Sequence, residues 1–447
     1  MIVIHPDAEI HFNEKVRRLA ALIKKYQPRQ ESAPSFVPER AQYHAIASKD
    51  ILAPALISET NHKDEEVGRY YNDQGSLVGL AGSDYREFSI LCEKIQKIPS
   101  IRNTISLKTI QNHIFNWCSL EFRKQAANEP MQYVLEKASS EVHDYEIWFP
   151  MAYTFVQSDM NLCNIEFRTI SSSTIYSWST MFKKDDEEIS EESKLFFKDI
   201  ETKFLGKAAV FVRISAESQR AIEIGRNSAD IAVRILNFLH PHAQYADIAS
   251  YSTLAGKAFI PYSETILSSP INFQTSSSFE KSPKEWHISN EQIIDLRHQF
   301  YNLINSIYAT PEESHSKFQK LLIDSFLRFL LYVFTSSPEQ KLIYILSALE
   351  SMLLKNRSEP IQGNVADRMA FFLSQDPTER LRIIEDFKRT YDLRSSYVHH
   401  GLLIEELESV ERFIADARHF FHKAFHCHDK YSTIEEFLKM IDQIKYS

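Results

Sequence analysis

The stretch PTERLRIIEDFKRTYDLRSSYVHHG, residues 377–401, decides the expected fold of the C-terminal part of the chain. Its apolar residues recur at steps of three and four, and they are Ile384, Phe387 and Tyr391. This spacing places them on one face of a helix that begins at Pro377, and the next two positions of that face are Arg394 and Val398. Because an isolated charge is costly to bury, Arg394 must meet a carboxylate, a phosphate or water.

The same helical periodicity continues through most of the chain around this stretch. The predicted helices cover residues 289–309, 313–334, 337–356, 362–374, 377–398 and 404–427, with a last turn or helix that reaches 446. Short Ser, Pro and Gly breaks separate them, as is typical of antiparallel helices joined by short loops. We therefore expect an all-α antiparallel helical bundle over residues 288–447.

The region before the bundle has a different pattern. Helices are predicted at 83–98 and 106–125, a hairpin from the runs 145–156 and 162–171 joined by QSDMN, and a buried strand at 208–215 followed by a helix. These segments predict a mixed α+β region over residues 1–274. The stretch 275–287 is rich in Ser and charged residues, so we expect it to be a linker.

Composition excludes several classes of site. The chain has 447 residues, which favours more than one domain, but only 9 glycines. It contains no G-x-x-x-x-G-K-[ST], G-x-G-x-x-G or G-x-S-x-G motif, so neither the two common phosphate-binding loops nor a serine-hydrolase motif is supported. The formal net charge of −9 means that any contact with nucleic acid has to be local.

The distribution of cysteine and apolar residues bears on the cellular compartment. The four cysteines are scattered without a C-x-x-C pair, which favours a reducing environment. The first residues show no signal-peptide layout, and the most apolar run, 326–334, is short and contains Arg328. We expect a cytoplasmic protein with no membrane segment.

Three charged residues fall at the inner faces of consecutive predicted helices. Glu350 borders the apolar positions of helix 337–356, Arg368 borders those of helix 362–374, and Arg394 lies within those of the next helix. One interpretation is a buried ion pair between Glu350 and an arginine that fixes how the helices dock. The other is a polar site that binds or cleaves a ligand.

His399 does not share the helix face of Arg394. Five positions at about 100° per residue place the two side chains about 140° apart. They could converge if the helix ends near Val398 and the chain turns at Gly401, a residue suited to that position. They could also converge if two copies of the bundle pack around a two-fold axis.

Several motifs in this region together resemble a known family. The segments LESMLL, NVADRMAFFL and TYDLRSSYVHHG, in this order on successive helices, resemble the signature of Apea-like HEPN domains. The resemblance covers roughly residues 290–430, and its centre is R-x4-H, here Arg394 and His399. Active HEPN nucleases often carry Asn, Asp or His after the arginine, where this chain has Ser395. The Apea-like branch tolerates serine there.

The resemblance implies a four- or five-helix bundle that dimerises and cleaves RNA without a metal or other cofactor, in antiphage defence, abortive infection or toxin systems. tRNA is one candidate substrate, and the N-terminal region would respond to an unknown trigger. The residues implied are Arg394 and His399 as catalytic residues, with Glu350, Arg368, Tyr391, Ser395 and His400 in support. His399 would act as general base or acid, since imidazole titrates near neutral pH, and Arg394 would hold the scissile phosphate. The alternative is a non-catalytic HEPN module for dimerisation or nucleotide binding.

Other clusters are interpreted as structural. His422 and His426 have the i, i+4 spacing that can bind zinc, but no further ligand motif accompanies them, so we expect a polar helix flank and no metal site. The HPHA sequence at 240–243 is interpreted as the end of a helix. The acidic stretch from Asp185 to Glu192 is interpreted as a solvated loop or helix start.

Overall fold

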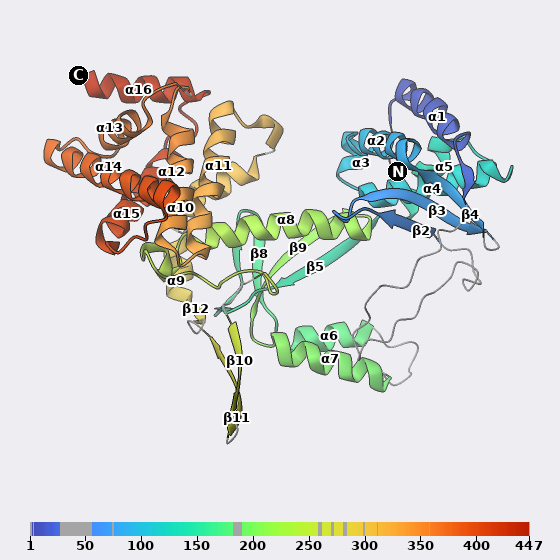
Figure 1. Cartoon of the computed structure of the whole chain (residues 1–447), viewed down its shortest axis with the longest axis horizontal. Helices are drawn as coiled ribbons and strands as arrows, with labels where there is room; N and C mark the ends of the chain where they lie inside the picture. The colour runs from blue at the N-terminus through green and yellow to red at the C-terminus, as the bar shows by residue number, and fades with distance from the viewer. Residues whose placement is uncertain are drawn as a thin grey trace. The chain divides into compact units, whose positions relative to one another are not determined.

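The computed structural model describes residues 2, 4–26, 56–73, 76–181, 190–257, 262–269, 272–279, 284–297, 300–310, 312–356 and 358–446 (Figure 1). The α-helices are α1 (Pro6–Ala20), α2 (Gly82–Gln96), α3 (Pro99–Arg102), α4 (Leu107–Phe122), α5 (Pro130–Ser140), α6 (Ser172–Met181), α7 (Glu191–Phe204), α8 (Ser218–Asn237), α9 (Asn290–Arg297), α10 (Phe300–Ala309), α11 (Lys317–Phe329), α12 (Pro338–Leu353), α13 (Ile361–Leu373), α14 (Pro377–His400), α15 (Leu407–Phe425) and α16 (Ile434–Tyr446). Short 3₁₀ helices include η2 (Pro241–Gln244) and η4 (Leu330–Phe334). The strands are β1 (Lys24–Tyr26), β2 (Leu56–Thr60), β3 (Glu66–Asp73), β4 (Ser76–Ala81), β5 (His143–Pro150), β6 (Thr154–Val156), β7 (Met160–Leu162), β8 (Ile165–Thr169), β9 (Ala208–Ala216), β10 (Tyr262–Ser269), β11 (Asn272–Phe279) and β12 (Trp286–Ile288).

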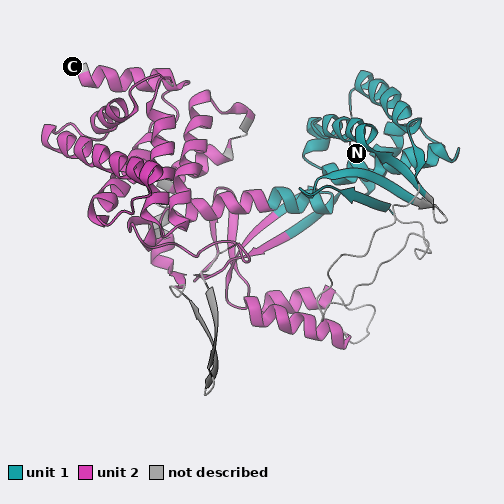
Figure 2. Cartoon of the chain, viewed as in Figure 1, with its two compact units in different colours: residues 1–146, 213–225 teal, residues 147–212, 226–447 magenta. Residues whose placement is uncertain are grey.

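The chain forms two compact units, which Figure 2 shows in different colours. Unit 1 contains Met1–Glu146 and Arg213–Gly225, and unit 2 contains Ile147–Val212 and Arg226–Ser447. The predicted order of an α+β region followed by helices is confirmed. The division into units nevertheless does not fall at residues 275–287, because the strands before that stretch share unit 2 with the C-terminal helices.

Unit 1 is built on an antiparallel sheet with the strand order β1-β4-β3-β2. Helix α2 packs against β3 and β4, and its apolar face joins α1, α4 and α5 in one core. Ser106 caps α4 by accepting a hydrogen bond from the Thr109 amide, as expected for a serine before a helix. Arg69 is 2% exposed within this core and pairs with Glu66 on the same strand, which satisfies its buried charge.

A second sheet has the strand order β5-β9-β8-β7. The expected strand at 208–215 is confirmed as β9. A hairpin also occurs near the predicted place, but its turn is not at the predicted residues. The hairpin joins β7 to β8 through the two-residue turn Cys163–Asn164, instead of through residues 157–161. Both turn residues have positive φ, 56° and 60°, which is the backbone of the tight turn that matches strand twist. Helices α6 and α7 lie side by side and pack on this sheet (Figure 1).

The stretch 275–287 is not a linker throughout. Residues 272–279 form β11, which pairs with β10, and residues 286–288 form β12, which pairs in parallel with β6. Residues 280–283 lie outside the described residues. Trp286 is opposite Thr154 in the β6–β12 pair and is 7% exposed. The chain therefore enters the helices from a buried strand that is fixed to the α+β part.

The C-terminal helices surround α12. Figure 1 shows α12 inside the group formed by α11, α13, α14 and α15, and each of these helices contacts it. The apolar α12 residues that are completely buried are Leu342, Ile345, Leu346, Ala348, Leu349, Met352 and Leu353. This apolar stripe is what the recurrence of apolar residues at steps of three and four in the sequence predicts. Helix α16 completes it by packing against α13 and α11.

Candidate functional site

Helix α14 carries the R-x4-H sequence and extends two residues beyond its predicted end. Asp376 caps its start by accepting from the Thr378 amide at 3.0 Å. Gly401 ends it with a left-handed φ of 68°, and its amide donates to the Tyr397 carbonyl at 2.8 Å. Because the helix continues through His400, the predicted turn near Val398 that could bring Arg394 to His399 does not occur.

An ion-pair network holds α14 on α15. Asp386, which is 5% exposed, receives hydrogen bonds from Arg382 at 2.8 Å and from Arg412 at 3.0 and 3.1 Å. Arg382 also donates to Asp416 of α15 at 2.8 Å. Several charges that share partners fix geometry better than an isolated surface pair does. The network therefore sets the position of the helix that carries the candidate site.

The inner face of α14 differs from the predicted one. Its buried residues are Ile383, Asp386, Phe387 and Thr390. Beyond Thr390 no residue of this helix is fully buried: Arg394 is half-buried and Val398 is 49% exposed. The predicted core placement of Val398 is therefore wrong, because the apolar contacts of the helix end one turn before Arg394.

The Nε atom of Arg394 is left without a hydrogen-bonding partner in the described part of the chain. This atom is also shielded from solvent. Glu350, half-buried on α12, lies close enough for the arginine to affect it. Burial raises the pKa of Glu350, and the positive charge of Arg394 partly opposes that rise. In the described part of the chain the two side chains form no ion pair, so the predicted Glu350 pair is not made with Arg394.

Arg368 has a structural role with other partners. It is 6% exposed and forms two hydrogen bonds of 2.9 Å with Glu359, one of 2.6 Å with the Leu353 carbonyl and one of 3.4 Å with Asp442. The hydrogen bonds from Arg368 are the main reason that the pKa of Glu359 falls to about 2. The interpretation in which Glu350 pairs with Arg368 is not borne out, since Arg368 pairs with Glu359, in the loop after α12.

The remaining predicted site residues lie along the last three turns of α14. His399 and His400 are exposed, and their ring centroids are 6.4 Å apart. Tyr391 and Ser395 are half-buried, and the Tyr391 ring stacks on Phe387 with centroids 6.3 Å apart. The structure thus places these residues on one helix but does not bring Arg394 and His399 to a common face within one chain.

A hydrogen bond to Glu339, a residue that the sequence analysis did not single out, holds the segment after α14 in place. Glu339, 5% exposed in the first turn of α12, accepts a hydrogen bond from the Ile404 amide at 2.8 Å. Between Gly401 and Ile404, Leu402 and Leu403 are 59% and 76% exposed. With Val398 they form an exposed apolar rim, defined as Val398, Leu402 and Leu403, beside the candidate site. The sequence signal for this rim is the GLLIEE segment, in which two leucines directly follow the helix-ending Gly401.

Other histidine clusters do not form a metal centre. The His422 and His426 rings lie 4.9 Å apart. No group of three or more His, Cys, Asp or Glu side chains that could hold a metal occurs among the residues described. His240 caps η2 by accepting from the His242 amide at 3.0 Å. Burial, with the charge of His242, lowers the pKa of His240 to about 3 and keeps it neutral at this position.

Two further predictions concern the acidic stretch from Asp185 to Glu192 and the absence of a membrane segment. Most of the acidic stretch from Asp185 to Glu192 lies outside the described residues, although Glu191 and Glu192 begin α7. Of the described helices, none combines the length and apolar character needed to cross a bilayer.

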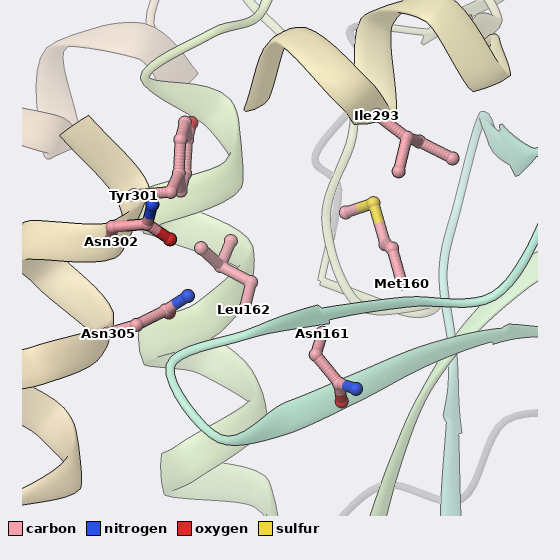
Figure 3. Close-up of a pocket in the computed structure, with 7 residues that line it drawn as sticks. All are labelled: Met160, Asn161, Leu162, Ile293, Tyr301, Asn302 and Asn305. Carbon is pink, nitrogen blue, oxygen red and sulfur yellow. The ribbon is translucent and has the colours of Figure 1, made fainter. Parts of the chain in front are cut away.

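A small cavity lies between β7 and helices α9 and α10 (Figure 3). Its volume is about 40 Å³, and it is lined by Met160, Asn161, Leu162, Ile293, Tyr301, Asn302 and Asn305. Asn305 accepts a hydrogen bond of 2.6 Å from the Cys163 amide, which holds the β7–β8 turn against α10. A space of this size admits a water molecule or two, well below the volume of a ligand pocket.

The strongest candidate site is therefore the C-terminal end of α14, where a half-buried arginine with a shielded Nε atom, two exposed histidines and an apolar rim occur within ten residues. Comparison of the chain with family models, with curated proteins and with solved structures found no match.

Proposed function

We propose that the chain is a metal-independent endoribonuclease that acts as a homodimer, with Arg394 and His399 as its catalytic residues. RNA is the proposed substrate, with tRNA as one candidate, and the resemblance to Apea-like HEPN domains extends the proposal to a defence or abortive-infection role. The observation that carries the proposal is the shielded Nε of Arg394, which lacks a hydrogen bond among the described residues. A guanidinium in this state favours an incoming oxyanion that can accept from it.

The chemistry requires no metal. A phosphate oxygen would accept hydrogen bonds from Arg394, which would also stabilise the additional negative charge of the transition state. His399 of one copy would remove the proton from the ribose 2′-hydroxyl, and the 2′-oxygen would attack the phosphorus. The bond to the 5′-oxygen would break, with a proton supplied by the second copy's His399. The products would be a 2′,3′-cyclic phosphate and a 5′-hydroxyl.

A second copy is needed because the two residues are about 140° apart on one unbroken helix. Two α14 ends related by a two-fold axis would place Arg394 and His399 of both chains around one cleft. The exposed apolar rim lies beside these residues and supplies surface that a second copy would cover.

Leu403→Asp is expected to convert the dimer to a monomer, because a carboxylate would replace the most exposed leucine of the rim in a desolvated interface. Analytical ultracentrifugation at micromolar concentration measures the change. Leu381→Asp is the matched control, since Leu381 is a leucine that is 61% exposed in the first turns of α14, at the other end of this helix from the rim. A monomeric wild type, or equal dissociation by both variants, would rule out this interface.

The cleavage proposal is tested by incubating the purified wild-type chain with total RNA and with tRNA in EDTA. We expect cleavage to persist in the chelator and to leave 2′,3′-cyclic phosphate and 5′-hydroxyl ends, which end-specific labelling distinguishes. Fragments with 3′-hydroxyl ends, or cleavage abolished by EDTA, would contradict the mechanism.

A non-catalytic HEPN module for dimerisation or nucleotide binding is the second candidate. The observation that favours it is the effect of Arg394 on the pKa of Glu350, since the arginine partly compensates a buried carboxyl group. In that case Arg394→Ala would destabilise the bundle and His399→Ala would change nothing.

A further inference from the structure

The segment 238–250, here called the docking loop, follows α8 and contacts the helical bundle, whereas Thr253 after it accepts a hydrogen bond of 2.8 Å from the Ala152 amide of the α+β part. Phe238 packs against Phe326 and Phe329 of α11, with ring centroids 5.5 and 6.4 Å apart. The hydrogen bonds between its backbone and bundle side chains join Tyr332 Oη to Ala243 O at 2.6 Å, Lys341 Nζ to Ile248 O at 2.8 Å and Ala246 N to Glu411 Oε1 at 3.2 Å. Polar side chains from η4, α12 and α15 therefore bind one loop.

Small residues allow this close approach. Ala243, Ala246 and Ala249 are spaced by three, and they are 0%, 0% and 5% exposed. With no side chain beyond Cβ, they let the loop backbone come within hydrogen-bonding distance of the bundle. The contact therefore combines the Phe238 ring and buried alanines with several hydrogen bonds to the loop backbone, a more polar composition than that of a continuous apolar core.

Lys341 is the unusual member of this contact. Its side chain is completely buried in the first turns of α12, where the helix dipole disfavours a cation. Nζ donates to the Ile248 carbonyl and lies 5.4 Å from the centroid of the Tyr332 ring. Among the described residues Lys341 makes no ion pair. Its charge is therefore poorly compensated when the loop is docked.

The charged and titratable groups that face Lys341 come from every element around it. They are Asp247 of the docking loop, His242 of η2, Tyr332 of η4, and Glu411 and Arg418 of α15. Burial lowers the pKa of Lys341 to about 7, while Asp247 and Glu411 oppose the change. Arg418 donates to Tyr332 Oη at 3.1 Å, so the aromatic ring beside Lys341 is shared with a second cation.

We propose that the docking loop is a proton-controlled latch, which is held on the bundle when Lys341 is neutral and is released when Lys341 is protonated. The neutral amine still donates its hydrogen bond to Ile248, so deprotonation removes the unfavourable charge without removing the contact. Release would take Phe238 off α11 and give the ammonium group access to water. The latch is independent of RNA cleavage and goes beyond the proposed function.

The direction of the pH dependence follows from linkage. In the released state the Lys341 side chain has its ordinary pKa of 10.5, and in the docked state its pKa is about 7. Between these values the released state binds more protons, so docking strengthens as pH rises. The docking equilibrium should change roughly tenfold between pH 7.0 and 8.5, a range above the ordinary titration of histidine.

Hydrogen exchange of peptides from residues 238–250 tests the latch in the full chain. After correction for the intrinsic pH dependence of exchange, we expect wild-type protection to be roughly tenfold higher at pH 8.5 than at pH 7.0. Peptides from α13 serve as an internal reference. An unchanged wild-type protection across this range would overturn the proposal.

Two substitutions assign the effect to Lys341. Lys341→Met is expected to remove the pH dependence, because no ionisable group remains at this position. Lys341→Arg keeps a permanent charge and is expected to hold the loop in a weakly protected state at both pH values. Tyr332→Phe is the control, because it loses the hydrogen bond to Ala243 but keeps Lys341. It should reduce protection by the same factor at both pH values, so that the ratio of protection between them stays that of the wild type. A wild-type slope in Lys341→Met would refute the assignment even if the other variants behaved as expected.

Discussion

His399→Ala is expected to slow RNA cleavage by about 10²- to 10⁴-fold while the fold stays intact. This is the usual contribution of a positioned general acid or base. His399 is exposed in the last turn of α14, so its replacement should alter the free energy of unfolding by less than about 0.5 kcal/mol. Cleavage rates on one tRNA substrate in EDTA, beside thermal unfolding curves, measure both quantities.

His400→Ala is the matched control for this substitution. The two histidines are adjacent, equally suited to complement the negative end of the helix dipole, and both exposed. Loss of helix-end stabilisation would affect the two variants alike, whereas loss of catalysis is expected only for His399. Equal cleavage by wild type and His399→Ala would exclude a catalytic role for this residue.

Arg368→Met is expected to lower the stability of the bundle by about 3–5 kcal/mol, the cost of removing one member of a buried charge network. The substitution leaves Glu359 and Asp442 without the partner that bonds to both, and frees the Leu353 carbonyl at the end of α12. Urea titration followed by hydrogen exchange of α13 and α16 peptides gives the free energy of opening of this region.

Arg328→Met is the comparison for Arg368. Arg328 is an exposed arginine of the same bundle with one side-chain hydrogen bond, to Ser351 at 2.7 Å, and its replacement should cost less than about 1 kcal/mol. Adding Glu359→Gln to Arg368→Met should recover part of the loss, because it removes a partly buried carboxylate that has lost its arginine. Similar stabilities for Arg368→Met and Arg328→Met would show that the network does not hold the bundle together.

The elements that depend on local pattern were predictable. The bundle helices and β9 have clear apolar periodicities, and their predicted bounds differ from the observed ones by few residues. The turn at Cys163–Asn164 was missed because cysteine is an uncommon residue at positive φ and only its contact with Asn305 on α10 explains it. Strand β11 was missed because its serine-rich sequence lacks an apolar alternation, and β12 was missed because it is only three residues long.

In the candidate site, too, the features that depend on spacing along one helix were predictable, and those that depend on neighbouring helices were not. Helical spacing placed Arg394 and His399 on different faces, and the structure retains that separation. Spacing within one helix does not determine which side chains pair across helices. Glu350 was therefore considered as a partner of Arg368, whereas in the structure Arg368 pairs with Glu359. The exposure of Val398, Leu402 and Leu403 depends on where the neighbouring helices end, which periodicity does not specify.

The parallel pair β6–β12 has a consequence for synthesis of the chain. Thr154 pairs opposite Trp286, so 286 − 154 = 132 residues must be added before β6 meets its partner. At about 5–20 residues per second, ribosomal elongation leaves that strand edge open for roughly 7–26 s. An unpaired edge invites pairing with other nascent chains. Slow translation or a shortage of chaperones would therefore reduce the yield of folded protein, because the unpaired edge of β6 would be exposed for longer. This loss would occur before the C-terminal helices have been made.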